Sequence, residues 1–369
     1  MLIFMTFELR DRLLSMIVDK SGGPLALQRK SIRIRAQAPQ LSISELIEAL
    51  VKDGDPGKGK EVAETLANQH IQFVTLLDAD YPIFLKEIPD PPLVLFYSGS
   101  LSVLKRPCIS IVGSRKVSDY GQQVTRQLAG ELAHVGFTVV SGLALGVDAF
   151  AHQAALEVQG RTAGVLGSGI DHIYPREHRS LAKSMVRNQG LVISEFPPGA
   201  PPRPFHFPFR NRIISGLAHA TIVVEAGEKS GTLITARHCL DQGRELFAVP
   251  GPIHAEGSKG ANLLIAKGEA QLITSVESLV SQLKPLLGMA VQHESRVMQT
   301  IEDPISRKIY EKLDAFEPLP LDLLVAELEL DPGNVISHLV ELQSLNLIES
   351  KPGQLYLRNS LARVAGSQA

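Results

Sequence analysis

The sequence predicts an α/β fold with a doubly wound, mostly parallel sheet at its centre, a small helical domain before it and a winged helix after it. Between residues 105 and 287, short apolar runs alternate with helical stretches. Such alternation is typical of a parallel sheet covered on both faces. Residues 1–72 show helical spacing alone. Residues 303–358 read as helices followed by an extended pair, the order found in winged helix-turn-helix domains.

The first 72 residues are predicted to form short helices. Apolar side chains recur at helical spacing within 13–17 and within 46–51. Ser42 precedes Glu45 by three positions, which is the pattern of a capping box at the start of a helix. The basic stretch 29–35 is open to two interpretations, a solvated helix face or a contact with DNA.

A proline-rich connector over 73–104, with one extended apolar run at Leu93–Tyr97, leads into the central domain at 105–287. Six strands are expected there, at 108–113, 137–142, 162–167, 191–195, 220–226 and 245–251. Helices are expected between them, at 120–135, 146–159, 177–188, 211–219 and 231–242. Because parallel strand–helix–strand connections are right-handed, these elements predict an extended Rossmann-like domain.

The end of the chain is predicted to form a separate small domain. A helical stretch near 275–287 is followed by a weakly patterned linker at 288–302. The winged helix is expected over 303–358, and 359–369 form a tail. Its helices are expected at 305–313, 320–328 and 332–345, before a terminal hairpin.

Charge is distributed unevenly along the chain. The net charge is −2, which alone does not favour a nucleic-acid binder. However, residues 103–260 carry 17 Lys and Arg against 12 Asp and Glu, a balance of +5. Residues 303–358 carry 5 against 10, a balance of −5. The central domain is therefore expected to attract phosphate, and the terminal domain to repel it.

The remaining composition excludes several classes of protein. No apolar run of 18 residues occurs, so we expect no membrane span. The N-terminus lacks the order of regions found in signal peptides, and we expect a cytoplasmic protein. Two cysteines, Cys108 and Cys239, cannot form a disulfide framework or a four-cysteine zinc site. Both are expected to be buried free thiols.

Glycine and polar residues follow nearly every predicted strand. In an open parallel sheet these loops lie at one edge, where ligands bind. Small residues let a phosphate approach backbone N–H groups there. The candidate DNA-binding residues in these loops are Gly113, Ser114, Arg115, Ser141, Gly142, Gly167, Ser168, Gly169, Gly227, Lys229, Ser230, Gly231 and Thr232. The alternative is that the glycines only make tight turns, which does not account for Arg115 and Lys229; Arg115 could also pair with Glu195 or Glu225.

Residues 203–212 combine three arginines, one histidine and three phenylalanines with no acid. Arginines bind phosphates and aromatic faces stack on unpaired bases, as single-stranded nucleic acid requires. The candidate contacts are Phe207, Phe209, Arg210, Asn211 and Arg212, together with Arg176 in a cationic loop nearby. The alternative for the phenylalanines is a packing role, which we expect for at least one of them.

These motifs together resemble the DprA/Smf family of bacterial DNA-processing proteins. The resemblance rests on IVGSR (111–115), SGLALGVDAFAH (141–152), VLGSGIDHIYP (165–175), FRNRIISGLA (209–218), EAGEKSGTLITA (225–236) and FAVPG (247–251). It implies a homodimeric protein that binds single-stranded DNA and loads RecA-type recombinase during natural transformation. It also implies DNA anchoring by Arg115 and by 210–212, a dimer surface in the last third of the central domain, and an N-terminal module like a sterile alpha motif or helix-hairpin-helix.

The alternative function is that of a nucleotide- or nucleoside-phosphate-binding or hydrolysing protein, similar to the lysine-decarboxylase-like phosphoribohydrolases. Where that family has a glutamate three residues after its Gly-Thr pair, this chain has Thr235, and glycosidic hydrolysis needs a carboxylate. We therefore expect no enzyme activity and no cofactor.

Two further sites carry open interpretations. Asp148 and His152 lie one helical turn apart, and a helix-capping aspartate with a packed histidine is favoured over a metal pair. The candidate recognition helix at 332–345 contains no Lys or Arg. An interaction with another protein, or a structural role, is therefore favoured there over duplex binding.

Overall fold

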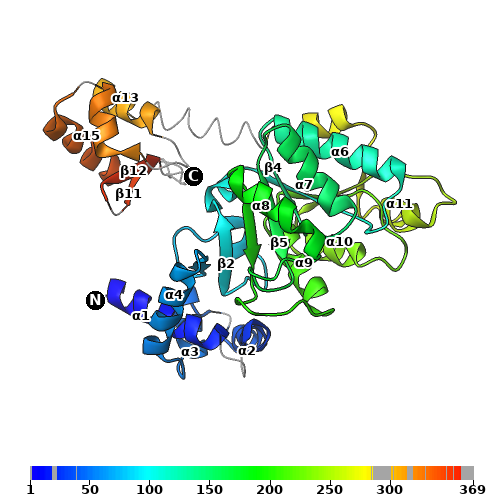
Figure 1. The fold of residues 1–369 in the computed structure, drawn as a ribbon, viewed down its shortest axis with the longest axis horizontal. Coiled ribbons are helices and arrows are strands. Elements are labelled where there is room, and N and C mark those ends of the chain that lie inside the picture. The colour runs from blue at the N-terminus through cyan, green and yellow to red at the C-terminus, as the bar shows by residue number, and fades with distance from the viewer. Residues whose placement is uncertain are drawn as a thin grey trace. The chain divides into compact units, whose positions relative to one another are not determined.

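The computed structural model describes residues 2–18, 23–38, 40–283, 285, 301, 303–313, 319–328, 330–345, 347–351 and 353–358 (Figure 1). They form two units, Met1–Ser281 and Gln282–Ala369. The predicted tail at 359–369 lies outside the described residues, as does the predicted linker at 288–302 except for Ile301. Each unit is described by itself.

Four helices open the first unit. They are α1 (Leu2–Val18), α2 (Gly23–Gln37), α3 (Ile43–Leu50) and α4 (Pro56–Asn68). The predicted apolar clusters at 13–17 and 46–51 supply the buried residues Leu13, Leu14, Ile17, Leu46, Ile47, Leu50 and Val51. The capping box is confirmed. The N–H of Glu45 donates to Ser42 Oγ at 3.3 Å, and the N–H of Ser42 donates to Glu45 Oε2 at 2.8 Å.

A nine-stranded sheet forms the centre of the first unit. Its strands are β1 (Gln72–Thr75), β2 (Val94–Gly99), β3 (Cys108–Val112), β4 (Thr138–Ser141), β5 (Thr162–Leu166), β6 (Leu191–Ser194), β7 (Ala220–Val223), β8 (Glu245–Ala248) and β9 (Gln271–Leu272). The order across the sheet is β1-β2-β6-β5-β4-β3-β7-β8-β9. All neighbours are parallel except β1 with β2 and β2 with β6. The mostly parallel, doubly wound sheet and its six predicted strands are confirmed.

The predicted connector at 73–104 is wrong as a connector, because its residues extend the sheet. Strand β1 begins at Gln72, and β2 pairs antiparallel with β6. The short helix α5 (Ile83–Lys86) lies between them. The prolines in this stretch lie outside the two strands, and the Tyr81 hydroxyl donates to the Pro92 carbonyl at 2.7 Å to hold the loop together. The extended run predicted at Leu93–Tyr97 overlaps β2, whereas β1 was not predicted.

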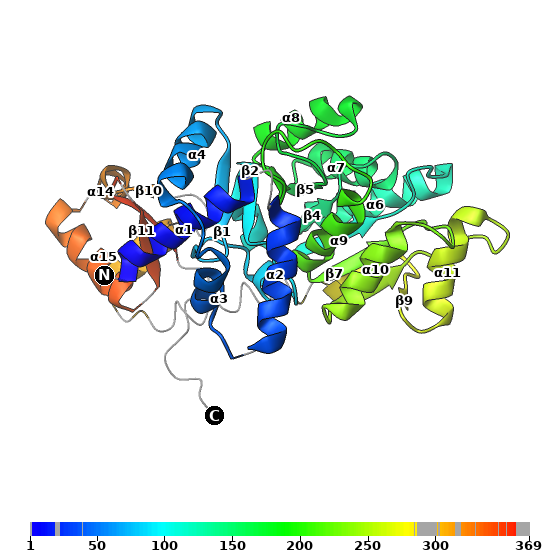
Figure 2. The ribbon, with the colours of Figure 1, turned by 90° about the horizontal axis from the view of Figure 1, so that it is seen from below.

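Helices cover both faces of the sheet. They are α6 (Asp119–His134), α7 (Val147–Glu157), α8 (Arg179–Arg187), α9 (His206–Gly216), α10 (Thr232–Asp241) and α11 (Lys259–Ala266). Helices α6, α7 and α8 follow one another on one face, and α9 packs beside α10 on the other (Figure 2). Helix α9 was expected to begin at 211 but begins at His206. Within the segment 203–212, residues 206–212 therefore lie in a helix and are not extended.

The chain reverses its direction across the sheet between β3 and β7. From β3 it proceeds through β4 and β5 to β6, and it then crosses back to β7 on the other side of β3. Neighbouring loops diverge at such a point, and the crevice outside the carboxyl ends of the two strands is where ligands bind in this class of sheet. The loops after β3 and β7 carry Arg115 and Lys229.

A buried ion pair fastens α9 to the end of β6. Arg212 and Glu195 are both 1% exposed, and the guanidinium donates to the two carboxylate oxygens at 2.9 and 2.8 Å. Arg212 Nε also lies 2.9 Å from Asp90 Oδ2. Burial disfavours the charged form, but Glu195 and Asp90 overcome this and raise the pKa of Arg212.

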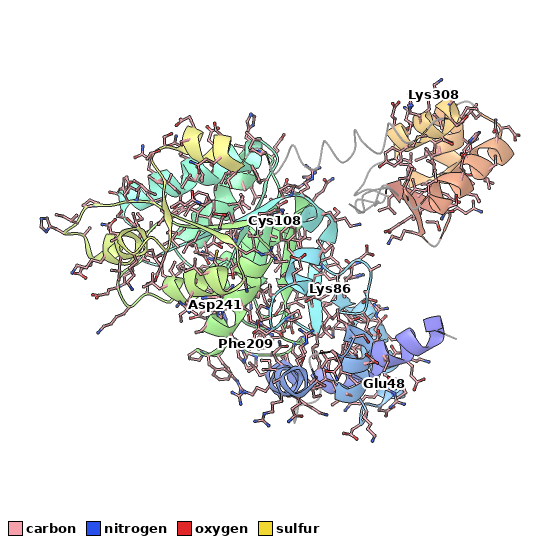
Figure 3. All side chains as sticks on the ribbon, turned by 180° about the vertical axis from the view of Figure 1, so that it is seen from behind. Glu48, Lys86, Cys108, Phe209, Asp241 and Lys308 are labelled. Carbon is pink, nitrogen blue, oxygen red and sulfur yellow. The ribbon has the colours of Figure 1, made fainter. Side chains whose placement is uncertain are left out.

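Both cysteines are buried free thiols, as predicted. Cys108 begins β3 (Figure 3) and Cys239 lies in α10. Burial raises the pKa of Cys108 to about 12 and that of Cys239 to about 11. Both thiols therefore remain protonated and unreactive at neutral pH. None of the helices among the described residues is long and apolar enough to span a membrane.

The described residues of the second unit from 303 onward form three helices and a small antiparallel sheet. The helices are α13 (Pro304–Lys312), α14 (Leu321–Leu328) and α15 (Pro332–Ser344), and the strand order is β10 (Leu319–Pro320), β12 (Leu355–Arg358), β11 (Ile348–Lys351). Asp303 caps α13 and Asp331 caps α15. The three predicted helices and the terminal hairpin are present; the winged-helix identity of this unit stays a prediction.

Replacing Arg212 by methionine is expected to destabilise the protein by about 3–5 kcal/mol, because Glu195 is left as a buried charge without its partner. Chemical denaturation followed by circular dichroism measures the loss. The matched control is Arg237→Met, since Arg237 pairs with Asp241 at the surface, where a pair contributes about 0–1 kcal/mol. An equal loss in the two variants would show that the buried pair does not hold α9 in place.

Candidate nucleic-acid interface

Three strand-end loops and the start of α9 meet around a small pocket of about 50 Å³. The residues that line it are Arg115, Gly142, Ala144, Leu145, Tyr174, Pro175, Phe207 and Arg210. They follow β3, β4 and β5, or lie in the first turns of α9. The predicted convergence of these loops is therefore present, with a cation and an aromatic ring from separate segments side by side.

Arg115 is the exposed cation of this pocket. Its guanidinium carbon lies 5.5 Å from the centre of the Phe207 ring, close enough for a cation–π contact. Neither carboxylate considered as its partner is available. Glu195 pairs with Arg212, and Glu225 accepts hydrogen bonds from the N–H and the hydroxyl of Ser118. Within the described part of the chain Arg115 forms no ion pair, so its charge is free to meet an anion.

Arg210 is a buried cation beneath the pocket rather than an exposed anchor. It is 4% exposed, and its Nη1 donates to the carbonyl oxygens of Gly142, at 2.7 Å, and Val165. Burial lowers the pKa of Arg210 to about 10, although Asp148 favours the charged form. The side chain is therefore still positive at neutral pH, and its charge acts through a medium of low dielectric constant.

Asp148 and His152 are both buried side chains of α7. Asp148 Oδ2 accepts the N–H groups of Gly142 at 3.0 Å and Ala144 at 3.3 Å, which fixes the loop after β4. His152 is fully buried, with Nδ1 2.6 Å from Thr162 Oγ1. Burial lowers the pKa of His152 to about 3, so the ring stays neutral. The packed histidine is confirmed, whereas the helix-capping role expected of Asp148 is wrong, because its carboxylate binds the loop before α7 and the N-cap of α7 is Gly146.

The strand-end glycines do not leave space for phosphate in the way predicted. A Cβ at Gly142 would lie 2.7 Å from Arg210 Nη1 and Asp148 Oδ2, and one at Gly167 would lie 2.9 Å from the Phe207 ring. Gly113 and Gly169 are crowded in the same way, by Val147 and by Pro197. These four glycines are needed because functional and core side chains fill the space above them. Gly227 and Gly231 do face open space. A Cβ at Gly227 would have no atom closer than 3.4 Å, and a Cβ at Gly231 would have none within 4 Å.

The hydroxyls predicted for DNA contact are bonded within the protein. Ser114 Oγ donates to the carbonyl of Lys116, Ser141 Oγ to that of Ile111, and Ser168 Oγ to that of His172. The loop after β7 is braced likewise, by Ser230 Oγ donating to Thr232 Oγ1 and by Thr232 Oγ1 donating to the Gly113 carbonyl. These side chains therefore shape the loops and do not point free groups at a ligand.

The aromatic segment divides into a pocket part and a packing part. The Phe207 ring lies 5.5 Å from the ring of Tyr174, inclined at 44°. Phe209 instead lies under the Arg212 guanidinium at 4.0 Å and beside Phe196 at 6.3 Å. One phenylalanine was expected to serve packing, and Phe209 does so. Phe209 is half-buried like Phe207, and its assignment to DNA contact stays a prediction.

The assignment of Arg212 to DNA contact is corrected, since the ion pair with Glu195 buries it. Asn211 is half-buried, and its Nδ2 donates to the Gly231 carbonyl at 3.4 Å, which links α9 to the loop after β7. Lys229 is exposed in that loop, and Arg176 is exposed in the short 3-10 turn Arg176–His178. His178 Nδ1 lies 2.7 Å from the Leu143 carbonyl, so this turn is fixed to the loop that carries Gly142.

Sequence reasoning missed two exposed residues of the pocket. Tyr174 is 44% exposed and Leu145 is 47% exposed. Tyr174 lies in a loop already noted for its cations, and an aromatic residue before proline at a strand-end loop was the available signal. Leu145 carried no such signal, because an isolated leucine beside a glycine turn is indistinguishable from a core residue in the sequence.

The comparison with protein families gives one match. A sequence model of the family described as DNA recombination-mediator protein A matches residues 72–284. The DNA processing protein DprA of Bacillus subtilis is 45% identical over 216 residues, which are 58% of this chain and 72% of that protein. Protein Smf of Escherichia coli is 39% identical over 284 residues, 75% of this chain and 76% of that protein.

Two solved structures are similar to this chain. DNA processing protein A from Streptococcus pneumoniae has 33% sequence identity and a TM-score of 0.59, and the match covers 75% of this chain and 97% of that one. The protein from Helicobacter pylori, whose structure was described for its single-stranded DNA binding mode, has 32% identity and a TM-score of 0.54 over 58% of this chain and 97% of that one. Matches at this level support a shared fold for the central sheet.

Acidification is expected to destabilise the protein through His152. Its pKa is about 3 in the folded chain and about 6.5 in an unfolded one. Between these two pH values the unfolded chain binds more protons than the folded chain. The contribution of the neutral His152 to the free energy of unfolding is therefore intact above pH 6.5. It is lost as the pH falls, by about 1.4 kcal/mol per pH unit at most. The measurement is the free energy of unfolding from pH 7 to pH 4.5 for the wild type and for His152→Asn. A slope as steep in the variant as in the wild type would rule His152 out as the cause.

Proposed function

The chain belongs to the DNA recombination-mediator protein A family, the DprA/Smf family, and on this basis we propose that it binds single-stranded DNA at the strand-end pocket around Arg115. The observation that carries the proposal is an exposed arginine, with no acidic partner among the described residues, that lies over the Phe207 ring beside Tyr174. Arginines that bind phosphate beside rings that stack on bases are the common solution for single strands. The protein from Helicobacter pylori is described as binding single-stranded DNA, which supports this assignment.

In the proposed mode, one phosphate lies against Arg115, and the buried charge of Arg210 strengthens the attraction from below. Arg210 Nη1 is held by two carbonyl oxygens, so it contributes a fixed positive potential at no cost in side-chain entropy. Tyr174 and Phe207 would contact a neighbouring base without reading its identity. The exposed cations Arg176 and Lys229 would extend the track to adjacent phosphates.

The residues around the pocket favour a binding role over a hydrolytic one. The position equivalent to the phosphoribohydrolase glutamate is Thr235, which is 2% exposed. The two nearest buried carboxylates are engaged, Asp148 with backbone N–H groups and Glu225 with Ser118. A free carboxylate is needed to activate water or protonate a leaving group. We therefore propose a protein without enzyme activity, and nucleoside-phosphate hydrolysis remains the alternative.

The wider proposal is that the bound strand is handed to a RecA-type recombinase during natural transformation, in the cytoplasm. It rests on the family to which the chain belongs and on the sequence-independent chemistry of the pocket. A mediator must hold any sequence, and contacts to phosphates and base faces provide this.

We also propose that the chain forms a homodimer through the last part of the central sheet. Apolar side chains gather there around a groove of about 250 Å³ lined by Leu233, Leu240, Leu263 and Leu264 together with polar residues. Ile234 and Leu263 are each 39% exposed. Exposed apolar patches of this kind mark interaction surfaces, and two pockets on a dimer would bind one strand with greater avidity.

The second unit is proposed to be a winged helix that contacts protein rather than duplex DNA. Its helix α15 contains no Lys or Arg and exposes Ile336, Val340 and Leu345, by 42%, 58% and 50%. Duplex binding depends mainly on cations that meet phosphates, and this helix offers an apolar face instead.

Replacing Arg115 by alanine is expected to weaken binding of an oligo-dT by at least tenfold. The slope of log affinity against log salt concentration should also become shallower by about 0.7, which is the value for one phosphate contact on a single strand. Fluorescence anisotropy at two salt concentrations measures both quantities. The same variant should lose the ability to promote recombinase assembly on single strands.

Arg126→Ala is the matched control, because Arg126 pairs with Glu157 at the surface and lines neither the pocket nor the groove proposed for dimerisation. Unchanged dT binding by Arg115→Ala would move the DNA site elsewhere. Equal affinity of the wild type for dT and for a matched duplex would overturn the stacking mechanism. Release of a free base from a nucleoside monophosphate would support the hydrolase alternative.

Replacing Leu263 by aspartate is expected to convert the proposed dimer into a monomer, because it places a charge in the apolar groove. Sedimentation equilibrium measures the molecular mass. The control is Val158→Asp, which replaces a side chain of similar exposure, 40%, after α7. A wild type that is monomeric at micromolar concentration, or a variant that remains dimeric, would exclude this surface.

A further inference from the structure

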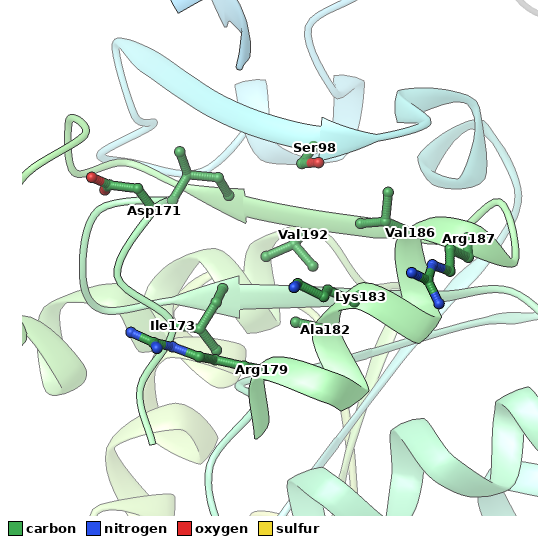
Figure 4. Close-up of a pocket in the computed structure, with 10 residues that line it drawn as sticks. Ser98, Asp171, Ile173, Arg179, Ala182, Lys183, Val186, Arg187 and Val192 are labelled. Atoms are coloured by element: carbon green, nitrogen blue, oxygen red, sulfur yellow. The ribbon is translucent and has the colours of Figure 1, made fainter. Parts of the chain in front are cut away.

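A second and larger cavity, of about 640 Å³, lies beside α8 on the β6 side of the sheet (Figure 4). It is lined by Ser98, Ile170, Asp171, Ile173, Arg179, Ala182, Lys183, Val186, Arg187 and Val192. None of these residues lines the pocket around Arg115. We call this cavity the α8 groove. Its volume is within the range of sites that bind ligands.

Three cations form one rim of the α8 groove. Arg179, Lys183 and Arg187 are spaced by four residues along α8, so they lie on one side of the helix about 6 Å apart (Figure 4). All three are exposed, and within the described residues none of them forms an ion pair. Leu181 and Met185 are buried on another side of α8 and do not line the groove. The cations therefore project over the groove without a partner.

The acid at the end of the groove does not neutralise this rim. Both carboxylate oxygens of Asp171 accept the N–H of Gly199, at 2.9 and 3.0 Å, and Oδ1 lies 3.1 Å from His172 Nδ1. Asp171 is therefore committed to its own loop. The groove keeps an uncompensated positive charge along about two turns of helix, which favours an occupant that carries several negative charges.

The floor of the α8 groove is aliphatic. It is formed by Ile170, Ile173, Ala182, Val186 and Val192, with Ser98 of β2 on the far side. None of the described residues that line it is aromatic, whereas the pocket around Arg115 contains Tyr174 and Phe207. Bases of a single strand bind mainly by stacking on aromatic rings. An aliphatic floor is better matched by aliphatic side chains of a peptide.

We propose that the α8 groove is a docking site for an acidic, amphipathic peptide segment of a partner protein. Carboxylates of the segment pair with Arg179, Lys183 and Arg187, and the two arginines can do so with two hydrogen bonds each. Apolar side chains of the segment cover the floor between α8 and β6. Each ion pair between a peptide carboxylate and a cation of the rim is exposed to solvent and therefore weak. Burial of the peptide's apolar side chains on the groove floor supplies most of the affinity, whereas the cations orient the peptide and speed its association.

The test uses the full-length chain and a fluorescent synthetic peptide of repeating Glu-Glu-Leu-Leu units, followed by fluorescence anisotropy at low salt. The variant is the triple charge reversal Arg179→Glu/Lys183→Glu/Arg187→Glu. The matched control reverses three exposed lysines outside both this groove and the proposed dimer surface, Lys52, Lys86 and Lys308. Both variants change the net charge by the same amount. Two reference peptides replace all leucines by serine or all glutamates by lysine.

The expected result is saturable binding of the Glu-Leu peptide, at least tenfold weaker with the groove variant and unchanged with the lysine control. Neither reference peptide should bind to the same extent. In parallel, oligo-dT binding should be unaffected by the groove variant and abolished by Arg115→Ala, so that failure of this proposal is distinct from failure of the DNA site.

Three outcomes would overturn the proposal. The first is no binding of the Glu-Leu peptide by the wild type. The second is equal weakening in the groove variant and the lysine control, which would show a general charge effect. The third is loss of dT binding in the groove variant as large as that in Arg115→Ala, which would make the α8 groove a continuation of the DNA track.

Discussion

The position of α9 depends on one buried interaction, the two-oxygen ion pair between Arg212 and Glu195. Arg212 also reaches Asp90 in the chain before β2. The pair therefore fixes α9 to the end of β6 and to the antiparallel side of the sheet at once. Because a charge left unpaired in the interior is costly, α9 cannot slide without breaking this contact. Phe207 and Arg210, in its first turns, are thereby held over the strand ends.

The site itself is built from one exposed and one buried arginine. Arg115 meets solvent, whereas Arg210 is enclosed by carbonyl oxygens and faces Asp148. A buried cation in a medium of low dielectric constant raises the local potential more than a surface one. It also requires the crowded glycines, since a Cβ at Gly142 would displace Arg210. Geometry and electrostatics in this site are thus set by the same contacts.

Three surfaces of the protein differ in charge and in the type of side chain that they expose. The residues around Arg115 combine cations with aromatic rings, which suits single-stranded nucleic acid. The α8 groove combines cations with an aliphatic floor, which suits an acidic peptide. Helix α15 has neither Lys nor Arg and exposes aliphatic side chains. Under the proposed functions, one chain would hold a strand and contact other proteins at three chemically different surfaces, without competition for a site.

The sequence by itself determined the α/β class, the six parallel strands, the capping box at Ser42 and the edge of the sheet where the site lies. These follow from local patterns, because apolar runs and turn residues act within a few positions. Tertiary structure alone decided what each residue of 207–212 does. Phe207 and Arg210 line the pocket, whereas Arg212 is buried and Phe209 packs against it. Neighbouring residues of the same type differ in role because the helix turns them toward different partners. Those partners, Glu195 and Asp148, are distant in sequence.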